Sequence, residues 1–254
     1  MSTVITSTDL FLAGRKAIVT GGSRGMGAGI AETLARYGAE VAITYWSSPD
    51  RAQEVVDRIV SAGGKAIALR ANNATPQGAK GGIAEAVEKL GGLDILVNNA
   101  GGGWFEPFQE ASDEHIEATI DLNIRGTIYA TQEALKHLPV GGRIVTIGSI
   151  NAESLPFSGP TVYGMSKAAL VAFTQGLARD VASKGITVNN IQPGPIDTDG
   201  NPAGGPSGEY LAGLTALGRF GTAAEVGELV AWIASDRSAF MTGSTVTIDG
   251  GWTA

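Results

Sequence analysis

Thr20-Gly21-Gly22-Ser23-Arg24-Gly25-Met26-Gly27 is the stretch that decides the fold. It follows a short apolar run and opens a helical pattern. Glycines at such a turn let the backbone approach a pyrophosphate, and the N-terminus of the following helix presents unpaired N–H groups to the anion. In this strand–turn–helix context the octet predicts dinucleotide binding.

Short apolar runs alternate with longer helical patterns along the rest of the chain. The runs are nearly continuous in apolar residues, as expected of parallel strands buried on both faces. Repeated βα units with right-handed crossovers predict an α/β, Rossmann-type, doubly wound, seven-stranded parallel sheet with helices on both faces. The predicted strands are 16–20, 40–45, 65–69, 93–97, 143–147, 186–191 and 244–248, and the predicted helices are 26–37, 49–62, 76–90, 113–138, 161–183 and 223–235.

Length, composition and net charge restrict the number of domains, the partners and the location that we expect. The 254 residues, 43% of them hydrophobic, fit one large domain over 1–254, without an internal repeat or a dividing linker. The net charge of −7 disfavours nucleic-acid and anionic-membrane partners. Residues 1–12 lack the pattern of a signal peptide, and no apolar run approaches the ~20 residues that span a bilayer. We therefore expect a soluble, cytoplasmic protein without membrane contact.

A long irregular stretch at 193–218 is rich in glycine and proline. A loop of this length inside a compact domain is usually functional. We expect a substrate lid at about 195–217, and the alternative is an ordinary surface loop.

The pair Tyr163 and Lys167 carries the most specific chemistry. Residues four apart on a helix share a face, about 5–6 Å apart at Cβ. An ammonium beside a phenol favours the phenolate, so the spacing predicts that Lys167 lowers the pKa of Tyr163. Such a tyrosine can give and take protons near neutral pH. Taken alone, Tyr-x-x-x-Lys also arises by chance in many helices.

Several motifs together resemble the short-chain dehydrogenases/reductases, especially the branch of β-ketoacyl-carrier-protein reductases and carbonyl reductases. The octet resembles the family's T-G-x-x-x-G-h-G, in which h is hydrophobic. Asn98-Asn99-Ala100-Gly101 closes the fourth predicted strand as the family's N-N-A-G does, and Pro193-Gly194 closes the sixth. Ser149 follows the fifth strand, upstream of Tyr163 and Lys167. The resemblance covers essentially the whole chain.

The resemblance implies a nicotinamide cofactor, and local residues point to NADP(H) over NAD(H). No carboxylate follows the second strand to bind a ribose 2′-OH or to repel a 2′-phosphate. Arg24 matches a basic position of NADP-using relatives, and Ser47 and Ser48 can add hydrogen bonds. Alternatively, Arg24 is solvated and the serines cap the next helix. The expected cofactor-binding residues are Gly21, Ser23, Arg24, Gly25, Met26, Gly27, Tyr45, Trp46, Ser47, Ser48, Asn72, Asn73, Asn99, Ala100, Gly101, Tyr163, Lys167, Pro193, Gly194, Ile196 and Thr198.

One of these positions departs from the family. Asn72 stands where the family usually has an Asp that accepts a hydrogen bond from the adenine amino group. Its side-chain carbonyl oxygen can still accept.

The resemblance also assigns Asn123, Ser149, Tyr163 and Lys167 as a catalytic tetrad. Tyr163 is then the proton donor, Ser149 stabilises charge on the carbonyl oxygen, and Lys167 binds the nicotinamide ribose. Asn123 is expected to hold a water that relays protons to Lys167. On residue type alone, Asn123 could instead satisfy backbone groups within a helix, and Ser149 could be a strand-end cap.

Other chemistries find little support. His115 and His137, the only histidines, fall on predicted surface helices, and no G-x-S-x-G motif is present. No His/Asp cluster has metal-ligand spacing and there is no cysteine, so we expect no metal.

The resemblance places the substrate over the nicotinamide, between loops after the fourth and fifth strands and the lid. Aromatic and apolar residues there predict a mainly apolar pocket for a small ketone or alcohol, although each could be ordinary packing. The expected pocket residues are Trp104, Ile150, Asn151, Glu153, Leu155 and Tyr210.

We therefore expect an oxidoreductase that moves a hydride between NADP(H) and a ketone or secondary alcohol, as a carbonyl or 3-oxoacyl reductase. The alternatives are a dehydrogenase of sugars, polyols or other alcohols, and a non-catalytic NADP sensor, since fold does not fix function. Relatives of this kind are usually homotetramers, which we expect here.

Overall fold

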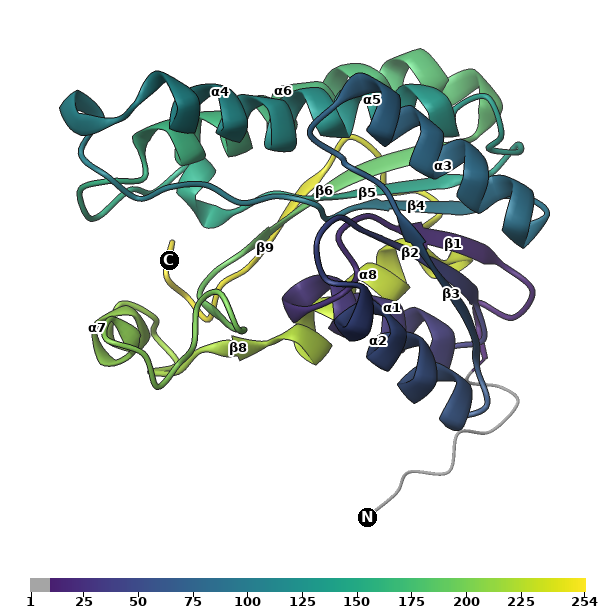
Figure 1. Ribbon diagram of the computed structural model, residues 1–254, viewed down its shortest axis with the longest axis horizontal. Coiled ribbons are helices and arrows are strands. Elements are labelled where there is room, and N and C mark those ends of the chain that lie inside the picture. Colours follow the sequence, from purple (N-terminus) through teal and green to yellow (C-terminus); the bar gives the residue numbers. More distant parts are fainter. Residues whose placement is uncertain (1–9) are drawn as a thin grey trace.

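The structure, a computed structural model, describes residues 10–254, so the expectation about a signal peptide rests mostly on residues outside the described part. Its centre is a seven-stranded parallel sheet in the order β3-β2-β1-β4-β5-β6-β9, which confirms the predicted fold (Figure 1). The strands are β1 Lys16–Val19, β2 Glu40–Tyr45, β3 Lys65–Arg70, β4 Ile95–Asn98, β5 Arg143–Ile147, β6 Thr187–Pro193 and β9 Thr245–Ile248.

Helices cover both faces of this sheet and enclose two apolar cores (Figure 1). Within residues 10–254, no helix is both long and apolar enough to cross a membrane. One face carries α1 Gly25–Arg36, α2 Pro49–Ser61 and α8 Ala223–Ile233, and the other carries α3 Pro76–Leu90, α4 Asp113–Ile120, α5 Gly126–Ala134 and α6 Thr161–Val181. Short 3₁₀ turns occupy Phe108–Glu110, Ile150–Ala152, Ala182–Lys184 and Asp236–Ser238.

The strand order reverses between β1 and β4, where the chain leaves β1 for β2 on one side and returns to β4 on the other. In open α/β sheets, ligands bind at the carboxyl ends of strands at such a switch point. The loops after these two strands are joined there, because Thr20 Oγ1 accepts hydrogen bonds from the backbone N–H groups of Asn99 and Ala100, each at 3.0 Å.

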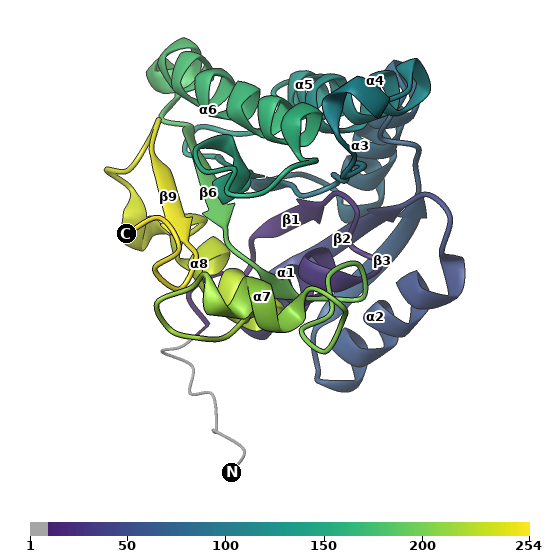
Figure 2. The ribbon, with the colours of Figure 1, turned by 90° about the vertical axis from the view of Figure 1, so that its left-hand side faces the viewer.

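Two segments differ from the predicted elements. The single helix predicted over 113–138 is interrupted by a π-helical turn, Asp121–Arg125, in which Gly126 N–H donates to Asp121 O, five residues back. The stretch predicted to be irregular contains the strand β7 Ile196–Asp197 and the short helix α7 Gly208–Gly213. β7 pairs with β8 Gly221–Thr222, and Figure 2 shows α7 in front of the sheet.

A row of polar side chains crosses the sheet beneath the helices of the α5 face. Asn98, Thr146, Asn190 and Thr245 stand in register on β4, β5, β6 and β9. Asn98 Nδ2 donates to Thr131 Oγ1 on α5 at 2.8 Å. Each member of the row has a buried side-chain oxygen or nitrogen without a hydrogen-bond partner among the described residues.

Candidate active site

The glycine loop between β1 and α1 forms a tight cradle. Gly21 has a left-handed φ of +65°, which side chains rarely adopt. A Cβ at Gly27 would lie 2.3 Å from the carbonyl oxygen of Gly21 and 2.5 Å from Asn99 Nδ2, so only glycine fits there. Arg24 is the N-cap of α1, and its side chain makes no capping hydrogen bond. The first N–H groups of α1 therefore face the turn that the glycines open.

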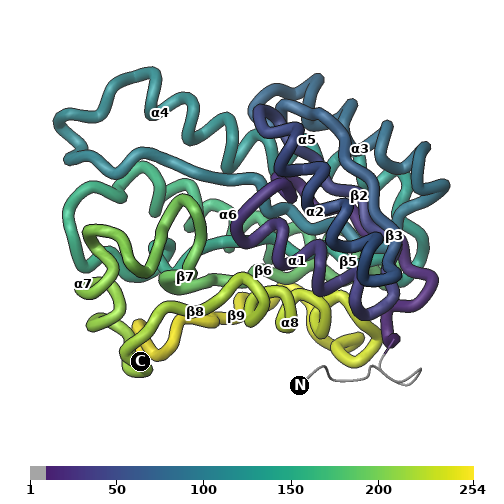
Figure 3. Tube along the Cα trace, turned by 60° about the horizontal axis from the view of Figure 1, so that its bottom comes forward, coloured from purple at the N-terminus to yellow at the C-terminus, as the bar shows by residue number. Residues whose placement is uncertain are grey.

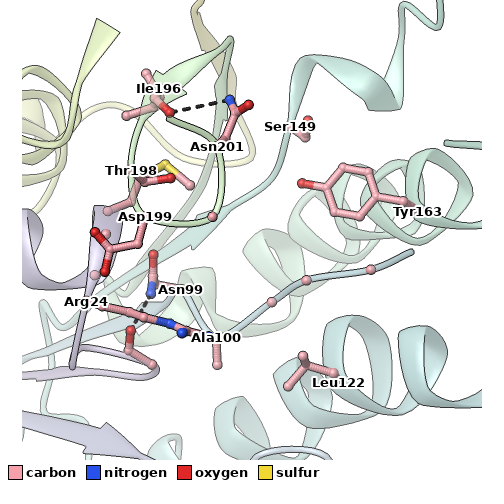
Figure 4. Close-up of a pocket in the computed structure, with 18 of the residues that line it drawn as sticks. Arg24, Asn99, Ala100, Leu122, Ser149, Tyr163, Ile196, Thr198, Asp199 and Asn201 are labelled. Atoms are coloured by element: carbon pink, nitrogen blue, oxygen red, sulfur yellow. Dashed lines mark hydrogen bonds between the residues drawn. The ribbon is translucent and has the colours of Figure 1, made fainter. Parts of the chain in front are cut away.

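Asn99 braces this loop. Its side-chain Nδ2 donates to the carbonyl oxygens of Thr20 at 2.9 Å and Gly21 at 3.1 Å. Predicted as a cofactor contact, Asn99 also holds the glycine turn in shape, and its side chain lies at the pocket wall together with Ala100 (Figure 4).

A single large cavity of about 1370 Å³ runs from the glycine loop to Tyr163. A volume above the usual ~300–1,000 Å³ of ligand pockets suits a dinucleotide together with a substrate. Figure 4 shows Ser149 and Tyr163 on one side of this cavity and Arg24, Asn99 and Asp199 on the other. Of the predicted cofactor residues, Lys167 and Pro193 are not part of its wall, and the others are.

The end of the cavity at which we expect the adenosine of the cofactor is lined by Tyr45, Trp46, Ser47 and Ser48. Ser48 precedes α2 as its N-cap but makes no side-chain capping bond, so its hydroxyl group is not used to cap this helix. Arg70 fixes Trp46, with its Nε donating to Trp46 O at 3.2 Å and its guanidinium carbon 4.6 Å from the ring centroid. Trp46 is thus tied to the last residue of β3, and the hydroxyl group of Ser48 is left free on this wall.

Asn72 lines the cavity but is partly committed to its own turn. Its Oδ1 accepts a hydrogen bond from Ala74 N–H at 3.0 Å, an Asx turn before α3. The same oxygen is the group through which we expected it to accept from adenine.

Tyr163 and Ser149 meet at the other end of the cavity. Tyr163 comes from the first turn of α6. Ser149 follows β5 and caps the turn Ile150–Ala152, accepting from Asn151 N–H at 3.1 Å. Burial raises the pKa of Tyr163, and its hydrogen bond with Ser149 opposes that rise. Ser149 is thus both the cap of a turn and a partner of the phenol.

Lys167 lies behind this pair and is 4% exposed. Its Nζ donates to the carbonyl oxygen of Ile147 at 2.9 Å and stands 5.7 Å from the Tyr163 ring centroid. Burial lowers the pKa of Lys167 to about 8. The prediction that Lys167 lowers the pKa of Tyr163 is wrong for the protein without cofactor, because desolvation disfavours the charged form of both groups.

Asn123 lies in the π-helical turn and faces the backbone after β4. Its Nδ2 donates to Gly102 O and to Ser166 Oγ, both at 2.8 Å, while its Oδ1 accepts from Gly102 N–H at 2.9 Å. A Cβ at Gly101 would be 3.1 Å from both Asn123 Oδ1 and Lys167 Nζ, so the two side chains converge on this loop. The side chain of Asn123 therefore satisfies backbone groups, as in the alternative, but these groups belong to the loop after β4 and not to its own helix.

The residues expected to line a substrate pocket are only partly brought together. Trp104, Ile150, Asn151 and Tyr210 line the cavity, whereas Glu153 and Leu155 do not. Leu155 packs instead against the start of α6, within 3.0 Å of a Cβ placed at Gly164.

Trp104 is held by a residue that the sequence pattern did not connect with the site. His115 stacks on Trp104 with ring centroids 4.4 Å apart and planes 8° apart, and its Nδ1 lies 2.8 Å from Glu106 Oε1. His115 lies on α4, a helix with exposed neighbouring residues as predicted, but its own side chain is half-buried between Trp104 and Glu106. In the described part of the chain, no group of three or more His, Asp or Glu side chains could hold a metal.

Sequence reasoning also missed several wall residues. Some of them come from segments brought in by tertiary folding, for which no local motif gave a signal, and others fall within the predicted lid at 195–217 without having been singled out as pocket residues. They include Leu122, Phe157, Asp199, Asn201, Leu211 and Trp252.

Comparisons with known proteins agree with this geometry. The family model described as "Enoyl-(Acyl carrier protein) reductase" matches residues 21–253. The "Cyclic-di-GMP-binding biofilm dispersal mediator protein" of Escherichia coli (strain K12) is 40% identical over 241 residues, 95% of this chain and 98% of that protein. A dehydrogenase/reductase from Sinorhizobium meliloti 1021 superimposes with a TM-score of 0.95 at 47% identity, covering 97% of this chain and 98% of that one.

A short chain dehydrogenase from Burkholderia cenocepacia J2315, solved in complex with NADP, gives a TM-score of 0.94 at 45% identity over 96% of this chain and 100% of its own. With its parallel sheet, glycine cradle and full-length relatives, the chain belongs to the short-chain dehydrogenase/reductase family.

Proposed function

We propose that this protein is an NADP(H)-dependent reductase that converts a ketone to a secondary alcohol. One observation carries the proposal: the phenol of Tyr163, beside Ser149, closes one end of the cavity whose other end is the glycine cradle. A cofactor held by the cradle and a carbonyl held at the phenol would occupy one continuous space.

The cofactor is NADP(H), and the residues present fit it. Arg24 forms no ion pair within the described residues, and Ser48 has a free hydroxyl at the adenosine end. A cation and neutral donors without a nearby β2 carboxylate favour a 2′-phosphate over a 2′-hydroxyl. The structural neighbour solved with NADP supports the same assignment.

Each catalytic side chain has a role that its surroundings support. When bound, NADPH supplies the hydride that the carbonyl carbon receives. Tyr163 gives its proton to the carbonyl oxygen, and Ser149 donates a hydrogen bond to that oxygen as negative charge develops. Lys167, held by Ile147 O, orients the cofactor ribose. Asn123 positions the Gly102 loop against the site and would hold the relay water.

The pKa of Tyr163 supports the reductive direction of the proposal. Because burial raises this pKa, the phenol keeps its proton at neutral pH. A protonated phenol is ready to donate, as ketone reduction requires, whereas alcohol oxidation needs the phenolate. The protonated phenol therefore supports reduction as the proposed direction near pH 7.

The substrate is a hydrophobic or aromatic ketone, in keeping with the aromatic wall of Trp104, Phe157 and Tyr210. Residues 195–217 serve as the lid of a single-domain protein, since Asn201, Tyr210 and Leu211 line the same cavity. A homotetramer in the cytoplasm completes the proposal, and size-exclusion chromatography with light scattering tests the assembly.

A substrate panel tests the proposed function. Aryl ketones, alkyl ketones and 3-oxoacyl thioesters are offered with NADPH, and sugars, polyols and simple secondary alcohols with NADP⁺, while nicotinamide absorbance is followed. We expect turnover of apolar ketones at neutral pH, and oxidation that gains relative to reduction as the pH rises. Turnover confined to sugars or polyols would replace the proposal by the dehydrogenase alternative.

A second candidate comes from the Escherichia coli relative, whose name describes cyclic-di-GMP binding. In that reading the chain binds NADPH and a cyclic dinucleotide without turnover. The panel separates the two: binding of NADPH and cyclic-di-GMP by calorimetry, without turnover of any carbonyl or alcohol, would favour the sensor.

A further inference from the structure

An ion pair ties the 195–217 segment to α2. The Arg51 guanidinium, on the first turn of α2, contacts the Asp199 carboxylate, which follows β7. Both side chains are about half exposed, at 49% and 58%. The contact joins residues far apart in sequence, and neither residue belongs to a motif of the family resemblance.

This ion pair lies beside the phosphate-binding loop. Asp199 lines the dinucleotide cavity, and Figure 4 places it on the same side as Arg24. Arg51 lines an adjoining hollow of about 640 Å³ together with Ser23, Arg24 and Asp199. In the same place, a Cβ at Gly25 would lie 3.4 Å from the Thr198 side chain, so the segment rests on the loop.

Arg51 also lies close to the adenosine wall. It is three residues beyond Ser48, and residues at that spacing share one side of a helical turn. Ser48 lines the cavity at the place where its hydroxyl group is free. Arg51 thus stands between two groups that we assign to the 2′-phosphate, Ser48 on its own turn and Arg24 across the shared hollow.

The charges around Arg51 would allow a phosphate group to replace Asp199 as its partner. A carboxylate at the wall of a cavity for a polyanion is repelled by its ligand unless a cation neutralises it. An exposed Arg–Asp pair contributes little stability, so breaking it costs little. A phosphate has more charge and more acceptor oxygens than a carboxylate, and it matches the guanidinium fork.

We propose that Arg51 is a selectivity residue for the 2′-phosphate of NADP(H), held by Asp199 until the cofactor binds and then transferred to the phosphate. Asp199 accordingly opposes NADP(H) binding, because it competes for the same guanidinium. The proposal rests on the proposed function only in that NADP(H) is the cofactor.

The test is calorimetric titration of the full chain with NADPH, NADH, 2′,5′-ADP and ADP. For Arg51→Ala we expect about tenfold weaker binding of NADPH and 2′,5′-ADP, with NADH and ADP changed by less than about twofold. For Asp199→Asn we expect roughly twofold to fivefold tighter binding of NADPH and 2′,5′-ADP. Arg58→Ala is the matched control, because Arg58 is on the same helix and hollow but pairs with Glu32.

Opposite signs for the two variants are the decisive result. If the Arg51–Asp199 ion pair only held the 195–217 segment against α2, both variants would weaken the binding of NADPH and of NADH alike, and the proposal would be overturned. An unchanged NADPH affinity in Arg51→Ala, or an Arg58→Ala effect as large as that of Arg51→Ala, would also overturn it. A wild-type protein that does not prefer NADPH would instead refute the cofactor assignment itself.

Discussion

Burial acts on Tyr163 and Lys167 together. Their spacing predicted correctly that they share a face of α6, but it could not reveal how deeply that face is covered. Desolvation keeps the phenol of Tyr163 protonated at neutral pH, and it lowers the pKa of the Lys167 ammonium to about 8, where half of it is neutral. In the protein without cofactor, the Lys167 ammonium therefore favours the Tyr163 phenolate less than their spacing in the sequence predicted.

The phenol of Tyr163 is the first group to test. We expect Tyr163→Phe to bind NADPH with affinity within about twofold of wild type, since the ring and its packing remain. Its kcat for ketone reduction should fall by roughly 10²- to 10⁴-fold, the usual contribution of a positioned proton donor. Calorimetry and steady-state rates measure the two effects.

Tyr129→Phe is the matched control, because Tyr129 lies on α5 and is not part of the cavity wall. It should leave both quantities unchanged. Near-normal kcat in Tyr163→Phe would show that another group donates the proton.

Lys167 gives a pH-dependent stability effect. Its pKa of about 8 in the folded protein lies below the ordinary value of 10.5. Below pH 8 the buried side chain is protonated, so the full cost of burying the charge lowers the stability of the fold there. At about 1.4 kcal/mol per pKa unit, this cost is roughly 3 kcal/mol, reduced by about 1 kcal/mol for the hydrogen bond to Ile147 O.

We therefore expect Lys167→Met to raise the free energy of unfolding by about 2 kcal/mol at pH 7 while abolishing activity. As the pH rises from 8 toward 10.5, the wild-type protein loses this cost, so the difference between the two proteins should shrink. Urea unfolding at several pH values measures it. A difference that grows with pH would contradict the assigned pKa.

At the scale of elements, the sequence predicted the seven strands closely because most of them are short, nearly continuous apolar runs between helical patterns. It did not predict the π-helical turn, since the helical periodicity of 113–138 continues through Asp121–Arg125. The turn is stabilised by a tertiary contact, the clamp of Asn123 on Gly102. The same holds for His115 behind Trp104 and for Arg51 with Asp199, which depend on distant partners.

The row of polar side chains on β4, β5, β6 and β9 (Asn98, Thr146, Asn190 and Thr245) leads to an expectation about buried water. A buried hydroxyl without any partner costs about 1–3 kcal/mol, so such groups are usually hydrated. We expect Thr146→Val, a change of nearly equal shape, to lower the free energy of unfolding by about 1 kcal/mol because bound water loses a partner.

Thr119→Val calibrates this loss, because Thr119 is buried and its Oγ1 donates to His115 O at 2.8 Å. If Thr146→Val stabilised the protein while Thr119→Val destabilised it, the row would be dry.

At the scale of the whole molecule, the cavity draws its wall from both halves of the sheet, from α1 and β2 to α6 and the C-terminal Trp252. Figure 3 shows the paired strands β7 and β8, which lead into and out of the 195–217 segment. A ligand that fills the cavity therefore adds contacts between these segments, and its binding energy adds to the stability of the fold.

We expect NADPH at about 100 times its Kd to add roughly 2.7 kcal/mol of stability. For a chain of this size that corresponds to a rise in Tm of about 5–10 °C, and an equal concentration of NADH should give less. Scanning calorimetry measures the shift. Equal shifts for the two cofactors would contradict the preference for NADP(H).

The aromatic lining of the cavity has an optical consequence. Three of the four tryptophans, Trp46, Trp104 and Trp252, lie in its wall, and only Trp232 on α8 does not. Tryptophan emission overlaps the absorption band of reduced nicotinamide, so a bound cofactor would quench most of the intrinsic fluorescence by energy transfer. The native chain thus carries its own reporter, able to follow cofactor arrival and release in real time without any label.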